Sequence, residues 1–242
     1  MSRPVRLGML TPSSNTVLEP VTAAMLAGLP GVSAHFSRFK VTEIALSGDA
    51  LAQFDDGPIL AAAELLAHAR VHAIAWNGIS AGWLGFDADQ QLCRRITGVT
   101  GIPSGTSMLA LNEVLALTHV RRLGIVTPYL PDVQDRIISN YTALGYACDA
   151  DRGLGIHENF AFAEVAPEQL CAMIRSVAAR KPDTIAVLCT NMHSGSLIAG
   201  LEAELGIPIY DTVATAVWKS MLLSGANPGR IVGWGRLFHL KP

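Results

Sequence analysis

The sequence predicts an α/β fold of two pseudo-symmetric lobes, each a parallel sheet flanked by helices, with an active site in the cleft between them. Three observations lead to this prediction: short apolar runs alternate with longer helical ones, the second half of the chain repeats segments of the first, and polar clusters follow the apolar runs. The chain has 242 residues, of which 50% are hydrophobic and 16% charged. It is therefore long and apolar enough to bury a sizeable core.

Short apolar or β-branched runs predict strands along the chain. They are Val5–Leu10, His72–Trp76, Leu123–Thr127 and Thr184–Leu188. Longer runs with apolar residues three and four positions apart predict helices. They include Ile59–Arg70, Pro167–Arg180 and Ser196–Leu205. Apolar strands that alternate with helices are typical of a parallel sheet covered on both faces.

Segments of the first half of the chain recur, in the same order, in the second half. The pairs are Arg6–Pro12 with Arg122–Pro128, Ile74–Gly78 with Ile185–Cys189, and Gly101–Pro103 with Gly206–Pro208, at offsets of 116, 111 and 105 residues. One such match could be chance, but an ordered series with slowly drifting offsets indicates a duplicated α/β lobe. The interval is too long for a solenoid repeat.

The duplication predicts the domain organisation. Residues 1–115 form an N-terminal lobe that the segment 213–242 completes, and residues 116–212 form a C-terminal lobe packed closely against it. No low-complexity linker separates the two, and the only hint of a boundary lies around Asp149–Gly155. The repeat also places Gly78 and Cys189 at equivalent positions, on opposite sides of the expected cleft.

Composition excludes several classes of function. Lys and Arg number 18 against 20 Asp and Glu, for a net charge of −2, and no basic stripe is present, which argues against a nucleic-acid partner. No apolar run approaches the roughly 18 residues of a membrane span, and the basic start Met1–Arg6 lacks the apolar region of a secretory signal. The four cysteines have no CxxC spacing. We expect a cytoplasmic protein with free thiols, with a homo-oligomer among the open alternatives.

Cys189 is the strongest candidate for a chemical role. It ends an apolar strand and precedes a turn that leads into a helix, where amides and a helix N-terminus can acidify a thiol. Such a thiol suits proton transfer or nucleophilic attack, whereas the alternative is a buried structural cysteine. Cys93, Cys148 and Cys171 have no comparable context and are interpreted as structural.

Hydroxyl and amide groups cluster after the other strands, where ligands of parallel sheets bind. Ser14 and Asn15, with free backbone amides, could bind a carboxylate, although capping of the next helix is an equally ordinary role. Tyr129, in the equivalent loop of the second lobe, could donate to an oxyanion or simply fill the interface. In the loop after the second strand, Gly78 allows close backbone approach and Ser80 supplies a hydroxyl.

No metal or cofactor is predicted. The seven histidines include no HxH or HExxH spacing, and no GxGxxG or Walker A motif occurs. His193 lies near Cys189 in sequence, where it could take part in the chemistry or serve only as a cap or surface residue.

Taken together, these segments resemble the aspartate/glutamate racemase superfamily, within its maleate isomerase and arylmalonate decarboxylase branch. The resemblance covers nearly the whole chain. It is carried by Thr11–Thr16 (TPSSNT), Val126–Tyr129 (VTPY), Cys189–Asn191 (CTN) and Gly233–Phe238 (GWGRLF). It implies two pseudo-symmetric lobes around one site, which the internal repeat predicts independently.

The resemblance also bears on the reaction. Racemases and maleate isomerases of this family carry a cysteine on each lobe, whereas this chain has Gly78 and Cys189, the arrangement of the arylmalonate decarboxylases. A carbanion made by loss of carbon dioxide needs only one acid, so Cys189 would suffice. Two features resemble the isomerases instead: Ser14-Asn15, and His157–Asn159, whose Asn binds a substrate carboxylate in those enzymes. Ile79-Ser80 replaces the Thr-Ser pair of the decarboxylases.

The favoured function is cofactor-independent decarboxylation of a substituted malonate-type dicarboxylate. Backbone amides after Pro12 and Cys189 would hold one carboxylate, and apolar residues such as Ile79, Trp83 and Met192 would exclude water. The alternatives are a maleate cis–trans isomerase or racemase, and a non-catalytic protein that binds small carboxylates. The expected catalytic residues are Cys189 and Tyr129, and the expected substrate-binding residues are Pro12, Ser14, Asn15, Gly78, Ile79, Ser80, Asn159, Thr190 and Asn191.

Overall fold

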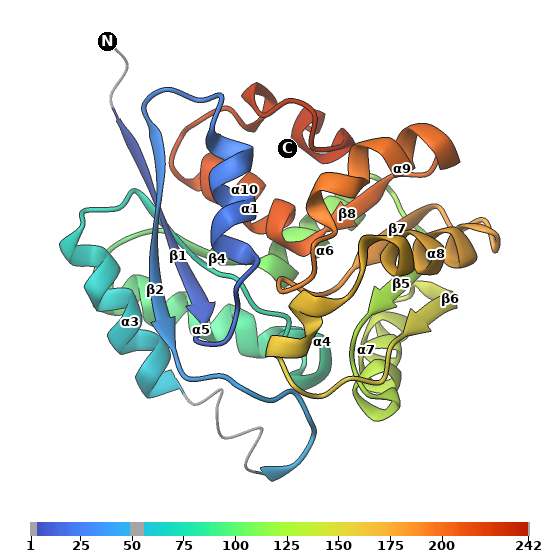
Figure 1. Cartoon of the computed structure of the whole chain (residues 1–242). Coiled ribbons are helices and arrows are strands. Elements are labelled where there is room, and N and C mark those ends of the chain that lie inside the picture. Colours follow the sequence, from blue (N-terminus) through green and yellow to red (C-terminus); the bar gives the residue numbers. More distant parts are fainter. Residues whose placement is uncertain (1–3, 49–55, 242) are drawn as a thin grey trace.

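Both predicted lobes are present, each built on a four-stranded parallel sheet (Figure 1). The computed structural model describes residues 4–48 and 56–241. The strand order is β2-β1-β3-β4 in the first sheet and β6-β5-β7-β8 in the second, so the two sheets share one topology. The strands are β1 (Val5–Pro12), β2 (Val32–Phe39), β3 (Ala73–Trp76), β4 (Ser104–Thr106), β5 (Arg122–Thr127), β6 (Ala147–Gly153), β7 (Thr184–Val187) and β8 (Ile209–Asp211).

Helices follow most of the strands and cover the sheets. They are α1 (Leu18–Leu26), α3 (Asp56–His68), α4 (Ala81–Leu84), α5 (Phe86–Thr100), α6 (Ser107–Leu117), α7 (Pro131–Ala143), α8 (Pro167–Ala178), α9 (Ile198–Leu205) and α10 (Thr212–Leu223). Short 3-10 turns occur at Phe160–Glu164, Gly195–Leu197, Pro228–Arg230 and Arg236–His239. In the described part of the chain, no helix has both the length and the apolar character needed to cross a bilayer.

The strands that the sequence predicts are the two central strands of each sheet. β3 and β7 are buried along their whole length, which is why they read as continuous apolar runs. The edge strands β2 and β6 are half exposed and carry polar residues, so their sequences lack that signal. Residues Asp149–Gly155, the hinted boundary, mostly belong to edge strand β6 rather than to a linker.

The three predicted helices are confirmed with small shifts. Ile59–Arg70 lies mostly in α3, and Pro167–Arg180 contains all of α8. The run Ser196–Leu205 is helical in two steps, because a 3-10 turn precedes α9.

The Gly-Ile-Pro repeat has a structural cause. Gly101 ends α5 and Gly206 ends α9, with φ angles of 69° and 73°. Such left-handed C-terminal positions favour glycine, and the following Pro leads the chain into the next strand. The two copies therefore mark the same helix-to-strand turn, once before β4 and once before β8.

The strand register shows the duplication in three dimensions. Trp76 in β3 pairs with Leu10 and Thr106, and Val187 in β7 pairs with Val126 and Asp211. The predicted lobe boundaries remain a prediction. The contacts of α10 with α6, β3 and β4 support assigning the C-terminal segment to the first lobe.

Candidate active site

A small cavity lies where the carboxyl ends of the central strands of the two sheets meet. Its volume is about 20 Å³, which is room for roughly one water molecule. It is lined by Pro12, Val41, Ile44, Trp76, Gly78, Ile79, Trp83, Tyr129, Asn159, Cys189 and Thr190. Ligands of parallel sheets bind at this edge, so the cavity is the candidate active site. Ligand pockets usually measure several hundred Å³, so part of the lining must move to admit a substrate.

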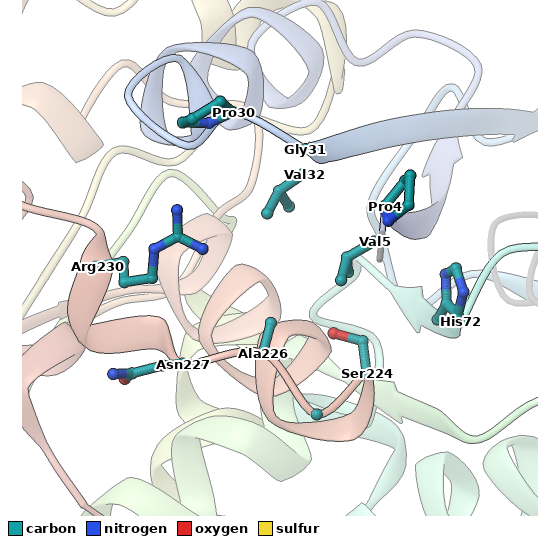
Figure 2. A pocket seen from close by; sticks show the side chains of 11 residues that line it. Pro4, Val5, Pro30, Gly31, Val32, His72, Ser224, Ala226, Asn227 and Arg230 are labelled. Carbon is teal, nitrogen blue, oxygen red and sulfur yellow. The ribbon is translucent and has the colours of Figure 1, made fainter. Parts of the chain in front are cut away.

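A larger cavity of about 380 Å³ lies elsewhere, and it does not fit this role (Figure 2). Pro4, Val5 and Val32 line it at the amino ends of β1 and β2, and Ser224 and Arg230 line it beyond the end of α10. This is the edge of the sheet opposite to the one at which parallel sheets bind ligands.

Most of the residues singled out from the sequence line the smaller cavity. They are Pro12, Gly78, Ile79, Tyr129, Asn159, Cys189 and Thr190. The other four lie behind the lining and hydrogen-bond to it: Ser14, Asn15, Ser80 and Asn191. The water-excluding role expected of Met192 has no support in the lining, because this residue is buried outside the cavity. His193 is exposed and also lies outside it.

Val41, Ile44 and Trp76 line the cavity without having been predicted. Val41 and Ile44 follow β2 in a segment without a recognisable motif, so nothing in the sequence marks them. Trp76 reads as one more apolar strand residue. The internal repeat does carry a signal for it, since the residue equivalent to Trp76 in the second lobe is the much smaller Val187.

The Cys189 thiol is buried in the lining of this cavity. The backbone N–H of Asn191 donates to its Sγ atom over 3.4 Å, and the Tyr129 hydroxyl hydrogen-bonds to it as well. Burial nevertheless raises the pKa of the thiol to about 12, and the nearby Asp211 carboxylate acts in the same direction. The expectation that a helix N-terminus acidifies this thiol is therefore wrong. α9 begins only at Ile198, and desolvation outweighs the local donors.

Tyr129 is held rigidly beside this thiol. Its ring packs edge-on against Trp83 and against Phe162, with ring centres 5.5 Å apart in each case. Burial, and then the neighbouring Cys189, raise the pKa of the phenol well above its usual range. The hydroxyl therefore keeps its proton at neutral pH and can act as a donor.

Two segments, one from each lobe, meet over the site, and we call residues 41–46 and 157–159 together the roof. The backbone N–H of Ile44 donates to His157 O over 2.9 Å, and that of Asn159 donates to Thr42 O over 3.0 Å. The side chain of Asn159 donates to Ser14 Oγ over 2.7 Å, and the Ser14 hydroxyl donates in turn to Val41 O over 2.6 Å. The predicted residues Ser14 and Asn159 therefore form one network that joins the lobes.

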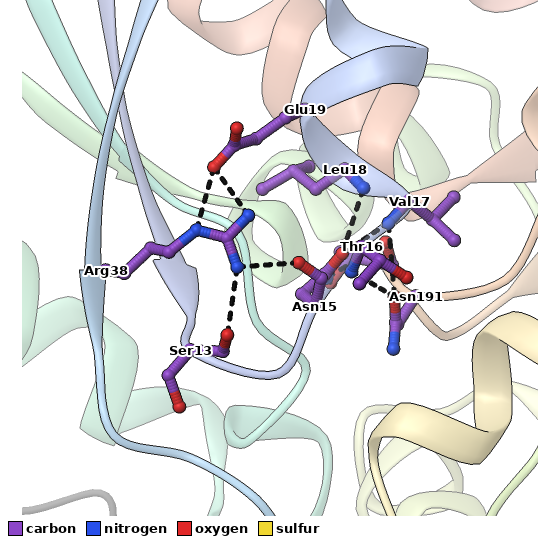
Figure 3. Close-up of polar contacts among 9 residues, drawn as sticks. Ser13, Asn15, Thr16, Val17, Leu18, Glu19, Arg38 and Asn191 are labelled. Carbon is purple, nitrogen blue, oxygen red and sulfur yellow. Dashed lines mark hydrogen bonds and ion pairs between the residues drawn. The ribbon is translucent and has the colours of Figure 1, made fainter.

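Asn15 takes the capping role that was its alternative interpretation. Its Oδ1 accepts from the backbone N–H groups of Val17 and Leu18 at the start of α1, over 3.0 and 2.9 Å. Asn191 Oδ1 accepts from Thr16 and Val17 N–H across the lobes, over 2.9 and 3.3 Å (Figure 3).

Side chains thus already accept from the amides of Thr16, Val17 and Leu18, and the binding of a carboxylate by Ser14 and Asn15 stays a prediction. The amide after Pro12 is occupied too, since Ser13 N–H donates to Phe39 O over 2.8 Å. Arg38, in an ion pair with Glu19, fixes this loop by donating to the carbonyl oxygens of Ser13 and Asn15 (Figure 3).

Other backbone donors remain available. In the described residues, the N–H groups of Ile79 and Thr190 have no protein partner, and both residues line the cavity. The two are equivalent in the repeat, at the offset of 111 residues that relates Gly78 to Cys189. The described part of the site thus has at least one unused backbone donor from each lobe. No cluster of His, Cys, Asp or Glu suited to a metal ion occurs in the described ranges.

Comparison with known proteins places this geometry among related enzymes. Residues 8–238 match the family model described as arylmalonate decarboxylase. The chain is similar to a maleate isomerase from Nocardia farcinica, with 26% identity over 96% of this chain and 94% of the relative. It is also similar to an arylmalonate decarboxylase from Bordetella bronchiseptica, with 28% identity over 57% of this chain and 59% of the relative.

A similar solved structure is a mutant of the Nocardia farcinica maleate cis-trans isomerase with a covalently bound succinylcysteine intermediate. It superposes with a TM-score of 0.87 at 23% identity, covering 98% of this chain and 99% of that chain. This likeness confirms the two-lobed fold.

Proposed function

Since the chain belongs to the arylmalonate decarboxylase family, we propose that it is a cofactor-independent decarboxylase of a substituted malonate-type dicarboxylate. The observation that carries this proposal is the single thiol of the cavity, Cys189, which shares the lining with Gly78, its equivalent in the repeat. A single buried acid can protonate a carbanion from one face, whereas proton exchange between two faces needs a partner. Location in the cytoplasm and assembly into a homo-oligomer remain predictions.

The unused donors of the site fit one carboxylate of such a substrate. The N–H groups of Ile79 and Thr190, from opposite lobes, are the available donors. The hydroxyl of Tyr129 would join them by leaving its hydrogen bond to Cys189. These groups would stabilise the enediolate that forms as carbon dioxide leaves. Removal of one such donor typically lowers the rate by ~10²–10³.

The reaction then proceeds in two steps. The bond between the α-carbon and the leaving carboxylate breaks, and its electron pair stays on the α-carbon, delocalised into the remaining carboxylate. Cys189 Sγ–H next gives its proton to this carbon, and the thiolate regains a proton from solvent. The raised pKa of Cys189 supports this order, because it keeps the thiol protonated until a basic carbanion forms. A positioned acid typically contributes ~10²–10⁴ in rate.

Apolar side chains surround the position of the leaving carboxylate. Val41 and Ile44 from the roof and Trp83 from α4 line the same cavity and are almost fully buried. Exclusion of water by such residues would favour loss of a charged carboxylate as neutral carbon dioxide.

The second candidate is a maleate-type cis–trans isomerase or a racemase. Its support is the Ser14–Asn159 pair, which reproduces the isomerase-like motifs at the edge of the cavity, and the cysteine adduct of the Nocardia farcinica neighbour. Attack on a double bond requires a thiolate, however, and burial of Cys189 opposes thiolate formation. A third candidate, a non-catalytic carboxylate-binding protein, would bind such ligands without turning them over.

The test is proton NMR in deuterated buffer with phenylmalonate and maleate, each offered to the wild type, Cys189→Ala and Cys148→Ser. Cys148 is a free, half-buried thiol outside the cavity and serves as the control. We expect phenylacetate with one deuterium added in turnover by the wild type and the control, and loss of turnover in Cys189→Ala. Fumarate in place of phenylacetate would establish the isomerase, and saturable binding without turnover would establish the binding protein.

A further inference from the structure

The space beside Gly78 is already filled. A Cβ atom on Gly78 would lie 2.7 Å from Trp76 Cη2 and nearer still to Cζ2 and Cε2 of the same indole. Real Cβ atoms essentially never come within 3.0 Å of a heavy atom outside their own residue and its chain neighbours. Gly78 has no positive φ, so its backbone conformation does not require glycine. The indole is what excludes a side chain at this position.

The indole cannot easily move away. Trp76 is 1% exposed, its Nε1–H donates to Ser80 Oγ over 3.4 Å, and its ring packs against Phe39 with centres 4.9 Å apart. A rigid ring of this size in a close-packed interior has no alternative position that leaves the neighbours in place.

In the second lobe the large and small side chains of the equivalent two positions are exchanged. At the equivalent strand position, Val187 is small, and two residues later Cys189 has a full side chain. In the first lobe the pair is Trp76 and Gly78. The two lobes thus divide the same space differently, and only one of them leaves room for a thiol.

We propose that Trp76 is the specificity-determining residue that makes this site one-sided. Its indole occupies the volume that a thiol opposite Cys189 would need, and it presents an aprotic wall to the second face of the reacting carbon. Its only N–H group is already directed at Ser80. The inference deepens the proposed function, because a carbanion held against this wall can receive its proton from the Cys189 side alone.

The first part of the test is a thermal cycle that needs no substrate. Melting temperatures are measured for the wild type, G78A, G78C, W76V and the doubles W76V/G78A and W76V/G78C. Overpacking of a core by about 1–3 kcal/mol corresponds to a drop in melting temperature of roughly 2–12 °C for a chain of this size. We expect that drop for the Gly78 variants in the wild-type background, and its loss or reversal in the W76V background.

A matched control separates relief at this position from general loosening of the core. Ile74→Ala truncates another fully buried residue of β3 without opening space at Gly78, so it should leave the penalty of G78C unchanged. If G78C does not fold but W76V/G78C does, the inference is supported. Equal penalties in both backgrounds, or failure of both G78C proteins to fold, would overturn it.

The second part measures the chemistry. A single enantiomer of 2-phenylpropionate is incubated in deuterated buffer, and exchange at its α-carbon is followed by NMR. We expect W76V/G78C to exchange ~10²-fold faster than W76V, the gain typical of one added acid–base group, whereas the wild type yields one product enantiomer from a prochiral malonate. If malonates are not turned over but the thermal cycle succeeds, the proposed function fails while the role of Trp76 stands. A G78C protein that is stable and exchanges rapidly with Trp76 intact would refute that role.

Discussion

The surroundings of Cys189 make its thiol an unusually weak acid. Desolvation raises its pKa to about 12 although Asn191 N–H and the Tyr129 hydroxyl both stabilise the thiolate. Position in the sequence shows that this thiol stands at the end of a strand and before a turn. It cannot show how deeply the opposite lobe buries the thiol, because that depends on residues more than a hundred positions away.

The first prediction concerns the pH dependence of turnover. Since the reactive form is the protonated thiol and its pKa is raised, kcat should stay flat from about pH 6 to about pH 10 and fall only as the thiol loses its proton. Alkylation of Cys189 by iodoacetamide near pH 8 should be at least ~10³-fold slower than that of an ordinary thiol, because the thiolate fraction is smaller by that factor. Mass spectrometry of the labelled peptides measures this. Loss of activity near pH 9 would indicate an ordinary thiol.

The second prediction concerns the Tyr129 hydroxyl. Tyr129→Phe keeps the ring contacts with Trp83 and Phe162 but removes the donor. We expect kcat to fall by ~10²–10³ with little change in melting temperature. Tyr146→Phe is the control, because Tyr146 packs on Tyr141 away from the cavity. A drop of equal size in both variants would mean that Tyr129 only fills space.

Among the elements, the central strands were predictable and the edge strands were not. β3 and β7 are buried on both faces, so their hydrophobicity alone identifies them. β4 and β8 have only three residues each, too few to show a pattern. The roof segments have no periodicity because they are stabilised by contacts with each other, so Asn159 was found through family resemblance alone.

The third prediction concerns helix α5. Asp89 in its first turn is buried, and desolvation raises the pKa of its carboxyl to about 7. In the unfolded chain this carboxyl loses its proton near its ordinary pKa of 3.8, so the folded state binds one extra proton between about pH 4 and pH 7. The stability it contributes is present below that ordinary pKa and is lost as the pH rises towards 7.

Asp89→Asn removes this titration. The variant should match the wild type near pH 4 and exceed it near pH 8 in free energy of unfolding, by up to about 4 kcal/mol. Urea denaturation at the two pH values measures the difference. An Asp89→Asn stability that falls with pH as steeply as that of the wild type would assign the loss to another group.

At the scale of the whole molecule, the two lobes are joined by hydrogen bonds that cross the site. Asn191 accepts from Thr16 and Val17 N–H, and its side chain donates to Asn159 O over 2.6 Å. The internal repeat predicted that the lobes face each other. It could not predict these bonds, because a repeat relates equivalent residues and the bonds join residues that are not equivalent.

The fourth prediction concerns this junction. Asn191→Ala removes the hydrogen bonds to Thr16 N–H and Asn159 O, whereas Val17 N–H keeps Asn15 as its partner. At about 1–3 kcal/mol for each of the two groups, we expect a loss on the order of 3 kcal/mol in the free energy of unfolding. Asn140→Ala, which removes a single bond from Asn140 to Gly82 O, is the control and should lose less. Calorimetry distinguishes one transition from two, and equal losses in both variants would contradict a special role for Asn191.

The packing of Trp76 over Gly78 has a consequence for how such a chain can change over generations. A second thiol is reached with a smaller loss of stability if position 76 becomes small first, because the reverse order passes through a protein with two side chains in one space. Each step alone brings little benefit, since a smaller residue 76 leaves a void and a cysteine without that void has no room. The indole therefore makes the order of substitutions matter: as long as Trp76 is present, a substitution that adds a second thiol is disfavoured, and the site keeps its single proton donor.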